Sequence, residues 1–332
     1  MTVQFTLIGL GQVGTSIGLA LAGRADELKR VGYDRSLAVQ QKAKKLGAVD
    51  SAPYNLHEAV EGADVVLLCI PLSQVEETLK LIGPDLREGC VVMDTAPVKR
   101  PVAGWFRTHV PAGRHYIGLL PALNTAYLAD NLHGPDSARA DLFKDGTLGI
   151  AAPFGTPEAA TEQAFHLAKM LGAEPLLLDL LEADGMSATV QLLPQLLAAA
   201  LLNATVDQPG WRDTRRLADR PYALATAPVF EESLEALSLA VRHNRENMLP
   251  ALELVIGGLS AIHAALKNND DDLDRRLERA VDDRLAWWQE RQSANWSGEK
   301  APTDIEMPDF IERLFGSLMG RKEKGRKVDE KK

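Results

Sequence analysis

The stretch VQFTLIGLGQVGTS, residues 3–16, decides how the rest of the chain is interpreted. Its apolar beginning is typical of a buried strand, and Gly9, Gly11 and Gly14 follow in the spacing G-x-G-x-x-G, directly before a helix-forming stretch. In such a unit the first glycine allows a tight turn, the second lets the backbone approach a pyrophosphate, and the third lets helix and strand pack closely. The stretch therefore predicts a dinucleotide-binding turn, with Gln12 and Val13 in the helical turn that faces the phosphates.

Two further positions fit the same kind of site. Asp34 ends the next predicted strand, twenty positions beyond Gly14, where a carboxylate can accept hydrogen bonds from a ribose and repel a 2′-phosphate. We therefore expect NAD rather than NADP, although the neighbouring Arg35 favours the opposite choice. Ile70 and Pro71 follow a third apolar run, at the carboxyl edge of the sheet where open α/β folds bind ligands.

Apolar runs alternate with amphipathic segments from residue 3 to about 150, and one more helix and the strand EPLLLD follow. This alternation predicts a doubly wound, Rossmann-type parallel sheet with helices on both faces. After Asp179 the strand pattern fades, and helical spacing such as Leu249, Leu252, Ile256 and Leu259 takes over. We expect a dinucleotide-binding domain at 1–179, an all-helical substrate and dimerisation domain at 180–292, and a C-terminal extension at 293–332.

Composition narrows the classes of function. A formal net charge of −9 argues against a nucleic-acid surface, which needs a basic footprint. The apolar runs 192–202 and 252–266 are shorter than the roughly 20 residues that cross a bilayer, so we expect buried helices and no membrane partner. The N-terminus lacks the features of a signal peptide, which points to the cytoplasm. The basic tail 321–332 has almost no apolar residue and is expected to be disordered.

Cysteines and histidines offer no metal site. Cys69 and Cys90 lie in strand-like apolar stretches without a metal or redox spacing, which predicts packing roles. The seven histidines form no H-x-x-H or H-E-x-x-H pattern. His115 lies five residues before Leu120 on an expected strand, and an odd offset places the two on opposite faces.

The order of motifs resembles the prephenate and arogenate dehydrogenase family from about residue 3 to 290. The resemblance rests on GLGQVGTS (9–16), DTAPVK (94–99), GLLPALN (118–124), EADGMSATVQLLPQ (182–195), GWRDTRRLA (210–218) and NRENML (244–249). It implies an NAD-dependent oxidative decarboxylation of a small cyclic carboxylate toward tyrosine, with the substrate held between a nucleotide domain and a helical domain that forms a homodimer.

This chain departs from the family where protons are handled. Leu120 stands for the histidine of the family's G-x-H-P motif, Pro97 for the serine of D-x-x-S-x-K, and Gln191 and Gln195 for polar residues of S-H-L-P-H. Leu120, Gln191 and Gln195 are therefore expected to line an altered substrate site.

Retained positions supply the candidate catalytic and anion-binding groups. Lys99 matches a family position after the strand that ends at Asp94, so these two residues are the candidate catalytic pair. Arg216, by motif position, and Arg212 are the candidates for binding the substrate carboxylate, because a guanidinium can hold a carboxylate with two parallel hydrogen bonds. On a helix these arginines would share one face, and pairing with Asp213 or Asp219 is the competing structural role.

Three hypotheses remain open on these residues. The first is a dehydrogenase of this family with weakened proton handling, in which Lys99 or water moves the proton. The second is an NAD-binding regulatory member without turnover, because the proton-handling residues are replaced. The third is reduction of an imine or keto acid with Lys99 as the acid.

Overall fold

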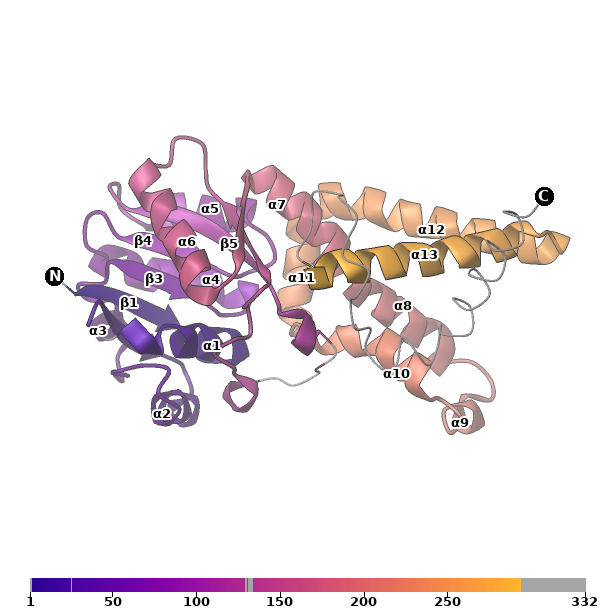
Figure 1. Cartoon of the computed structure of the whole chain (residues 1–332), viewed down its shortest axis with the longest axis horizontal. Coiled ribbons are helices and arrows are strands. Elements are labelled where there is room, and N and C mark those ends of the chain that lie inside the picture. The colour runs from indigo at the N-terminus through magenta and orange to yellow at the C-terminus, as the bar shows by residue number, and fades with distance from the viewer. Residues whose placement is uncertain (1, 25, 129, 131–133, 294–332) are drawn as a thin grey trace, which may run out of the picture. The chain divides into compact units, whose positions relative to one another are not determined.

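The computed structural model describes residues 2–24, 26–128, 130 and 134–293, so the expected disorder of the tail 321–332 lies outside the described residues. Seven strands form one sheet: β1 (Val3–Ile8), β2 (Leu28–Tyr33), β3 (Val65–Leu68), β4 (Val91–Asp94), β5 (His115–Ala122), β6 (Thr147–Ala151) and β7 (Glu174–Leu178). The helices that alternate with these strands are α1 (Gln12–Ala20), α2 (Leu37–Lys45), α3 (Leu56–Val60), α4 (Leu72–Ile82), α5 (Arg100–His109) and α6 (Glu158–Leu171). Figure 1 labels most of these elements.

The strand order is β2-β1-β3-β4-β5-β6-β7, and β1 pairs in parallel with both β2 and β3. The order reverses at β1, and α1 and α4, which follow the neighbouring strands β1 and β3, pack on opposite faces of the sheet, so the loop after β1 opens at the switch point. The predicted Rossmann-type sheet with its helices is confirmed.

One pair of strands differs from the predicted all-parallel sheet. β6 runs antiparallel to β5, with Leu120 opposite Gly149. A parallel neighbour needs a crossover over one face of the sheet, usually a helix. The described part of 123–146 holds only the short turns Thr125–Tyr127 and Pro135–Ser137, so the chain returns along the same edge.

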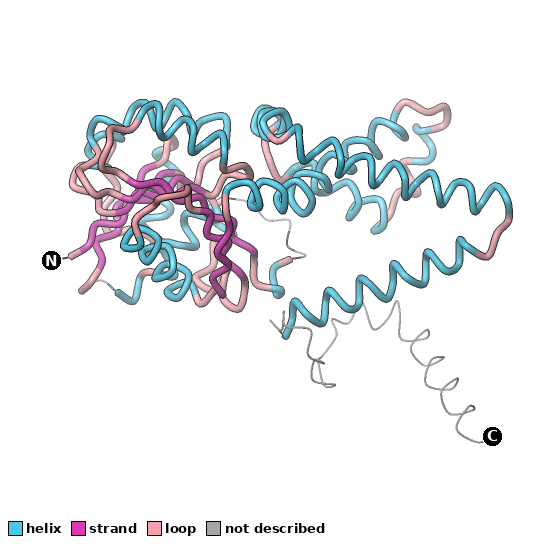
Figure 2. Tube along the Cα trace, turned by 90° about the horizontal axis from the view of Figure 1, so that it is seen from above, coloured by secondary structure: helices cyan, strands magenta, loops and turns pink. Residues whose placement is uncertain are grey.

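Two apolar clusters cover the two faces of the sheet, which appears as one layer between helices in Figure 2. On one face α1 and α6 pack through residues such as Ile17 and Leu167. On the other face α4 and α5 pack through residues such as Val75 and Val102. The central parallel strands β3 and β4 are thus buried on both sides, which explains their continuous apolar runs in the sequence.

The second half of the chain is helical, as predicted. Its elements are α7 (Leu180–Ser187), a π-helical segment (Ala188–Leu192), α8 (Leu193–Val206), α9 (Trp211–Thr214), α10 (Arg220–Thr226), α11 (Leu234–His243), α12 (Arg245–Asn268) and α13 (Asp272–Ser293). Leu192, Leu237 and Met248 from these helices belong to the same apolar cluster as α4.

The boundary between the two compact units of the structure lies further along the chain than the predicted domain boundary. Because the cluster on the second face continues into α8, α11 and α12, the first compact unit is Met1–His263 and the second is Ala264–Lys332. The predicted boundary after residue 179 coincides with the change from strands to helices, and it stays a prediction.

The expectation that both long apolar runs are buried helices is wrong for the second run. α12 is one continuous helix of 24 residues, and Leu254 and Ile256 are 78% and 60% exposed. Leu180–Val206 and Arg245–Asn268 are each long and apolar enough to cross a membrane, a test that core helices of soluble proteins also pass. An exposed apolar face of this size calls for a partner surface.

Candidate functional site

The glycine-rich turn has the geometry that its spacing predicts. Gly9 has a φ of +92°, and a Cβ there would lie 2.3 Å from the Cys69 carbonyl oxygen. A Cβ on Gly14 would lie 2.0 Å from the Gly9 carbonyl oxygen, so this glycine lets α1 pack against the turn. Gly11 is the N-cap of α1, and no atom lies within 4 Å of the Cβ it lacks. Space above the helix N-terminus is thus open to an anion.

The Gln12 and Val13 side chains both support this turn. The Gln12 amide nitrogen donates to the Ser137 carbonyl oxygen at 3.4 Å, and Val13 packs against the apolar cluster beneath. Their backbone N–H groups belong to the first helical turn, where such groups have no intrahelical acceptor. Those groups are available to a phosphate.

Asp34 is held rigidly beside the same turn. Its carboxylate accepts the Leu10 N–H at 2.9 Å and the Ser36 N–H at 2.9 Å. The first contact ties the end of β2 to the loop between β1 and α1. Each carboxylate oxygen keeps acceptor capacity for a ribose hydroxyl.

A pocket of about 630 Å³ opens at this edge and brings together Gly9, Asp34, Arg35, Ile70 and Pro71. Tyr33, Leu56 and Leu81 give it apolar walls. A pocket with apolar and polar walls, beside a fixed carboxylate and near the N-terminus of α1, suits the adenosine diphosphate half of a dinucleotide. The residues present therefore fit the cofactor that the sequence predicts.

The candidate catalytic pair lies next to this edge but is closed off from solvent. Lys99 and Asp94 are each 0% exposed, and the Lys99 Nζ lies 3.0 Å from the Asp94 Oδ1. Nζ also donates to the Ala96 carbonyl oxygen at 2.6 Å and to the Asp94 carbonyl oxygen at 3.3 Å, so its donors are all used. Burial lowers the pKa of Lys99 and the Asp94 charge opposes that effect.

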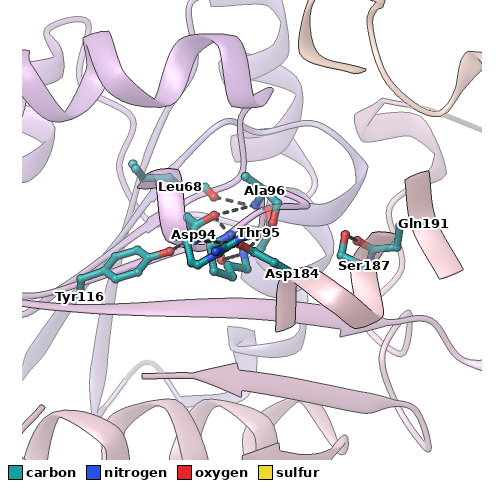
Figure 3. Close-up of polar contacts among 10 residues, drawn as sticks. Leu68, Asp94, Thr95, Ala96, Tyr116, Asp184, Ser187 and Gln191 are labelled. Atoms are coloured by element: carbon teal, nitrogen blue, oxygen red, sulfur yellow. Dashed lines mark hydrogen bonds and ion pairs between the residues drawn. The ribbon is translucent and has the colours of Figure 1, made fainter. Parts of the chain in front are cut away.

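Tyr116 completes this network from β5. Its hydroxyl donates to the Asp94 Oδ2 at 2.6 Å, and the Ala96 N–H donates to Oδ1 at 2.8 Å, as Figure 3 shows. Burial and the nearby Asp94 charge raise the pKa of Tyr116 well above its ordinary value. The stem of Lys99 passes over Gly118, where a Cβ would lie 2.4 Å from its Cδ.

Asp184 links this strand-end loop to the helical part. It is 0% exposed on α7, and its carboxylate accepts the backbone N–H of Lys99 and the Arg100 Nε, the latter at 3.0 Å. The Asp184 carbonyl oxygen accepts the Asn244 side-chain amide at 2.7 Å. Arg100 also pairs with Glu246 at 3.2 Å. Two segments far from Asp184 in sequence, Lys99–Arg100 and Asn244, thus bind this one buried residue.

Leu120 lies near the carboxyl end of β5, beside this network. It is half-buried and packs against the small cluster of Ala151, Leu178 and Ala183. Its face of the strand is that of Tyr116 and Gly118, because side chains alternate along β5. His115 is at the opposite end of β5, where it pairs in register with Val91.

Gln191 lies in the π-helical segment, and Gln195 lies one turn later in α8. The Ser187 hydroxyl donates to the Gln191 Oε1 at 2.8 Å, and the Gln195 Nε2 donates to the Gln191 carbonyl oxygen at 3.0 Å. Figure 3 shows the Ser187 and Gln191 side chains facing each other. The buried Gln195 Oε1 has no partner, so the site keeps one unused acceptor.

The structure does not place Arg212 and Arg216 as the sequence suggested. α9 ends at Thr214, so the two arginines do not share one helix face. Both are exposed and, within the described residues, neither forms an ion pair with Asp213 or Asp219. The adjoining cavity of about 320 Å³ is lined only by residues between Thr205 and Tyr222, including Trp211 and Leu217. No strand-end residue reaches it.

Sequence reasoning missed three members of the buried network. Tyr116 could have been found, because it precedes Gly118 by two residues on a strand and so shares its face. Arg100 and Asn244 could not, because their common partner Asp184 lies 84 and 60 residues away in the chain. No group of three histidine, cysteine or acidic side chains in the described residues could hold a metal ion.

Comparisons with known proteins agree with this architecture. Residues 17–175 match the family model described as prephenate dehydrogenase, nucleotide-binding domain. A cyclohexadienyl dehydrogenase of Zymomonas mobilis is 26% identical over 281 residues, which cover 82% of this chain and 92% of that protein. A prephenate dehydrogenase of Bacillus subtilis is 23% identical over 290 residues, covering 83% and 74%.

Solved structures show the same fold. Prephenate dehydrogenase from A. aeolicus, in complex with hydroxyphenyl propionate and NAD+, superposes with a TM-score of 0.75 at 18% identity, covering 86% of this chain and 98% of that one. Arogenate dehydrogenase of Synechocystis gives 0.67 at 22% identity, covering 86% and 100%. Relatives, fold and the dinucleotide pocket agree: the chain is similar to prephenate and arogenate dehydrogenases, and its residues 17–175 match the nucleotide-binding domain of that family.

Proposed function

We propose that this protein is an NAD-dependent dehydrogenase that removes a hydride from a small cyclic carboxylate of the prephenate or arogenate type, with loss of CO2. The observation that carries the proposal is the pocket at Gly9, Asp34 and Ile70 in a chain similar to this family. When bound, NAD supplies the hydride acceptor.

In this proposal the residues of the chain bind and orient the cofactor. Gly11 and the first turn of α1 receive the diphosphate, and Asp34 accepts the ribose hydroxyls while repelling a 2′-phosphate. Ile70 and Pro71 continue the same wall of the pocket toward the ends of β4 and β5.

Proton handling is weakened in this proposal. Leu120 is half-buried among apolar side chains, where it can exclude water but cannot take a proton. Lys99 and Asp94 were proposed as the catalytic pair, and for Lys99 to transfer a proton its Nζ would have to leave Ala96 and Asp94. We therefore propose that both residues position the strand-end loop and that water removes the proton.

Arg216 and Arg212 remain the proposed ligands of the substrate carboxylate. Both guanidinium groups are exposed and unpaired within the described residues, so a carboxylate would meet no internal competitor. Gln191 and Gln195 are the proposed neutral contacts, and the free Gln195 Oε1 favours a substrate group that donates a hydrogen bond.

A homodimer in the cytoplasm is part of the proposal. The exposed leucines and isoleucines of α12 form an apolar face that a second copy can cover. Light scattering on the purified full chain should give twice the chain mass. A monomer, or recovery in the membrane fraction of lysed cells, would contradict this part.

The activity itself is tested by following NADH formation with prephenate and with arogenate. We expect slow turnover with at least one of them, because a positioned general base typically contributes about 10²–10⁴-fold. A chain that binds NAD by calorimetry but gives no NADH with either substrate would instead be the NAD-binding member without turnover. Leu120 is the observation that favours this second candidate.

A further inference from the structure

We propose that Glu77 and Glu235 select a dinucleotide that lacks a 2′-phosphate, and that Glu235 makes the helical part a participant in cofactor binding. This inference rests on the proposed function, because it assigns new residues to the same pocket. Both glutamates line that pocket together with Asp34 and Arg35.

One face of α4 lines the pocket. Gln74, Glu77, Thr78 and Leu81 line it at a spacing of three and four residues, whereas Val75 and Leu79 on the opposite face are buried in the core. The position of Glu77 is therefore fixed by the packing of its helix on the sheet.

Glu235 comes to the pocket from a distant part of the chain. Ala236 and Leu237 are buried, and Leu237 and Ala240 join the apolar cluster that contains Val75 and Leu79 of α4. The Ser233 hydroxyl caps α11 by accepting the Ala236 N–H at 3.2 Å, which fixes the helical turn that carries Glu235. Packing between α11 and α4 thus holds Glu235 at the adenosine side of the pocket.

The charge of this lining is unbalanced. Three carboxylates and one guanidinium line the pocket, and within the described residues the Glu77 and Glu235 side chains form no ion pair or hydrogen bond. Glu76, the neighbour of Glu77, contacts His109 instead and does not line the pocket. A 2′-phosphate adds a charge of about −1.5 to −2, so two uncompensated carboxylates raise the cost of holding it. Asp34 is therefore not the only residue that disfavours a 2′-phosphate, and the single positive charge of Arg35 does not balance the three carboxylates.

Calorimetry on the full chain can test this assignment with NAD and NADP as probes. We compare the wild type with Glu77→Gln, Glu235→Gln and the double variant, and use Glu76→Gln as the matched control on the same helix. We expect each single variant to tighten NADP binding about twofold to fivefold, in line with measured interactions of exposed charges, while NAD changes less. The gain should shrink at high salt because these charges are exposed.

Hydrogen exchange supplies a second measurement. NAD should protect the peptide covering 234–243 from exchange, together with the glycine-rich turn. An unchanged ratio of NADP to NAD affinity in the double variant, or an equal change in Glu76→Gln, would overturn the selectivity role. Protection of the turn without 234–243 would overturn the role of the helical part. Absence of any NAD binding to the wild type would instead refute the proposed function and this inference with it.

Discussion

Replacing Lys99 with methionine distinguishes a positioning role from a catalytic one. Methionine preserves most of the apolar stem that lies over Gly118 but removes Nζ and its charge. The Asp94 carboxylate, which is 0% exposed, then keeps only the Tyr116 hydroxyl and the Ala96 N–H as partners.

The size of the effect follows from these contacts. Removing one partner of a buried ion pair costs about 3–5 kcal/mol, because the remaining charge is left uncompensated. We expect the lower end, about 3 kcal/mol, since two donors stay on Asp94. Asp94→Asn should destabilise by a comparable amount. The double variant removes both charges. Its loss in free energy of unfolding should therefore be about 2 kcal/mol smaller than the sum of the two single losses, within the range measured for contacting residues.

Urea unfolding of the four proteins measures these differences as shifts of the transition midpoint at unchanged slope. Turnover is measured on the same samples at temperatures where all are folded. A positioning role predicts that both single variants lose stability together and lose activity to a similar extent. If Lys99→Met instead keeps its stability within about 0.5 kcal/mol and loses activity by about 10²-fold or more, then Lys99 takes part in proton transfer and the reasoning is refuted.

Four further outcomes are expected. Asp34→Ala should weaken NAD binding about tenfold, because the ribose loses charge-assisted hydrogen bonds, and calorimetry with Glu76→Gln as control measures it. Leu120→His should raise turnover by about 10²-fold if a missing base limits the rate, and an unchanged rate would place the limit elsewhere. Partial burial disfavours the charged form of Asp50, but hydrogen bonds from Arg30 outweigh it and lower its pKa, so the pair stabilises the fold above the ordinary pKa of an aspartate and loses that contribution as pH falls. Asp50→Asn should therefore reduce stability at neutral pH and narrow the gap to the wild type in acid, which thermal melts at several pH values will show. Burial raises the pKa of the Cys90 thiol to about 12, so its reaction with a thiol reagent should stay slow at pH values where an ordinary thiol is ionised, and fast labelling of the folded protein would contradict its buried position.

The fold was largely predictable because its signals are local. Strand, glycine turn, helix and Asp34 lie within residues 3–34, and each follows from the conformation that its own neighbours allow. The antiparallel direction of β6 was not predictable from its own residues, since Thr147–Ala151 would form a strand in either direction. The direction of β6 is decided by the connection before it, because the described part of 123–146 contains no crossover helix.

The buried helix faces were misjudged for a related reason. An apolar spacing such as Leu249, Leu252, Ile256 and Leu259 predicts that a helix has an apolar face, but it does not say what covers that face. In this chain Leu252 packs against the core, whereas Leu259 is 61% exposed. Burial by a second copy and burial within one chain give the same pattern in sequence.

The polar centre shows the limit of motif reasoning most clearly. Lys99 and Asp94 were predicted as the catalytic pair because they match positions of the family that the chain resembles. Their contacts instead support the positioning role proposed above: Lys99 gives its donors to Asp94 and Ala96, and Asp184 accepts from Lys99 and Arg100. Whether a charged side chain takes part in catalysis or holds the structure in place depends on its contacts. Some of these contacts join residues up to 85 positions apart in the sequence.

A closed polar network beside an apolar strand end also bears on how such an enzyme could still work. Each of Lys99, Asp94, Tyr116 and Asp184 is paired, so none of these charges needs to reorganise when a cofactor or substrate arrives. Such fixed groups can hold the loop between β4 and α5 still, and positioning of reactants is worth about 7–11 kcal/mol, more than the contribution of one general base. If aromatisation of a cyclic substrate supplies the driving force, rigid placement of the reacting carbon over the nicotinamide is the larger requirement. Under the proposed function, a leucine in place of a base at position 120 would slow the reaction, and the buried network would still serve to position the reactants.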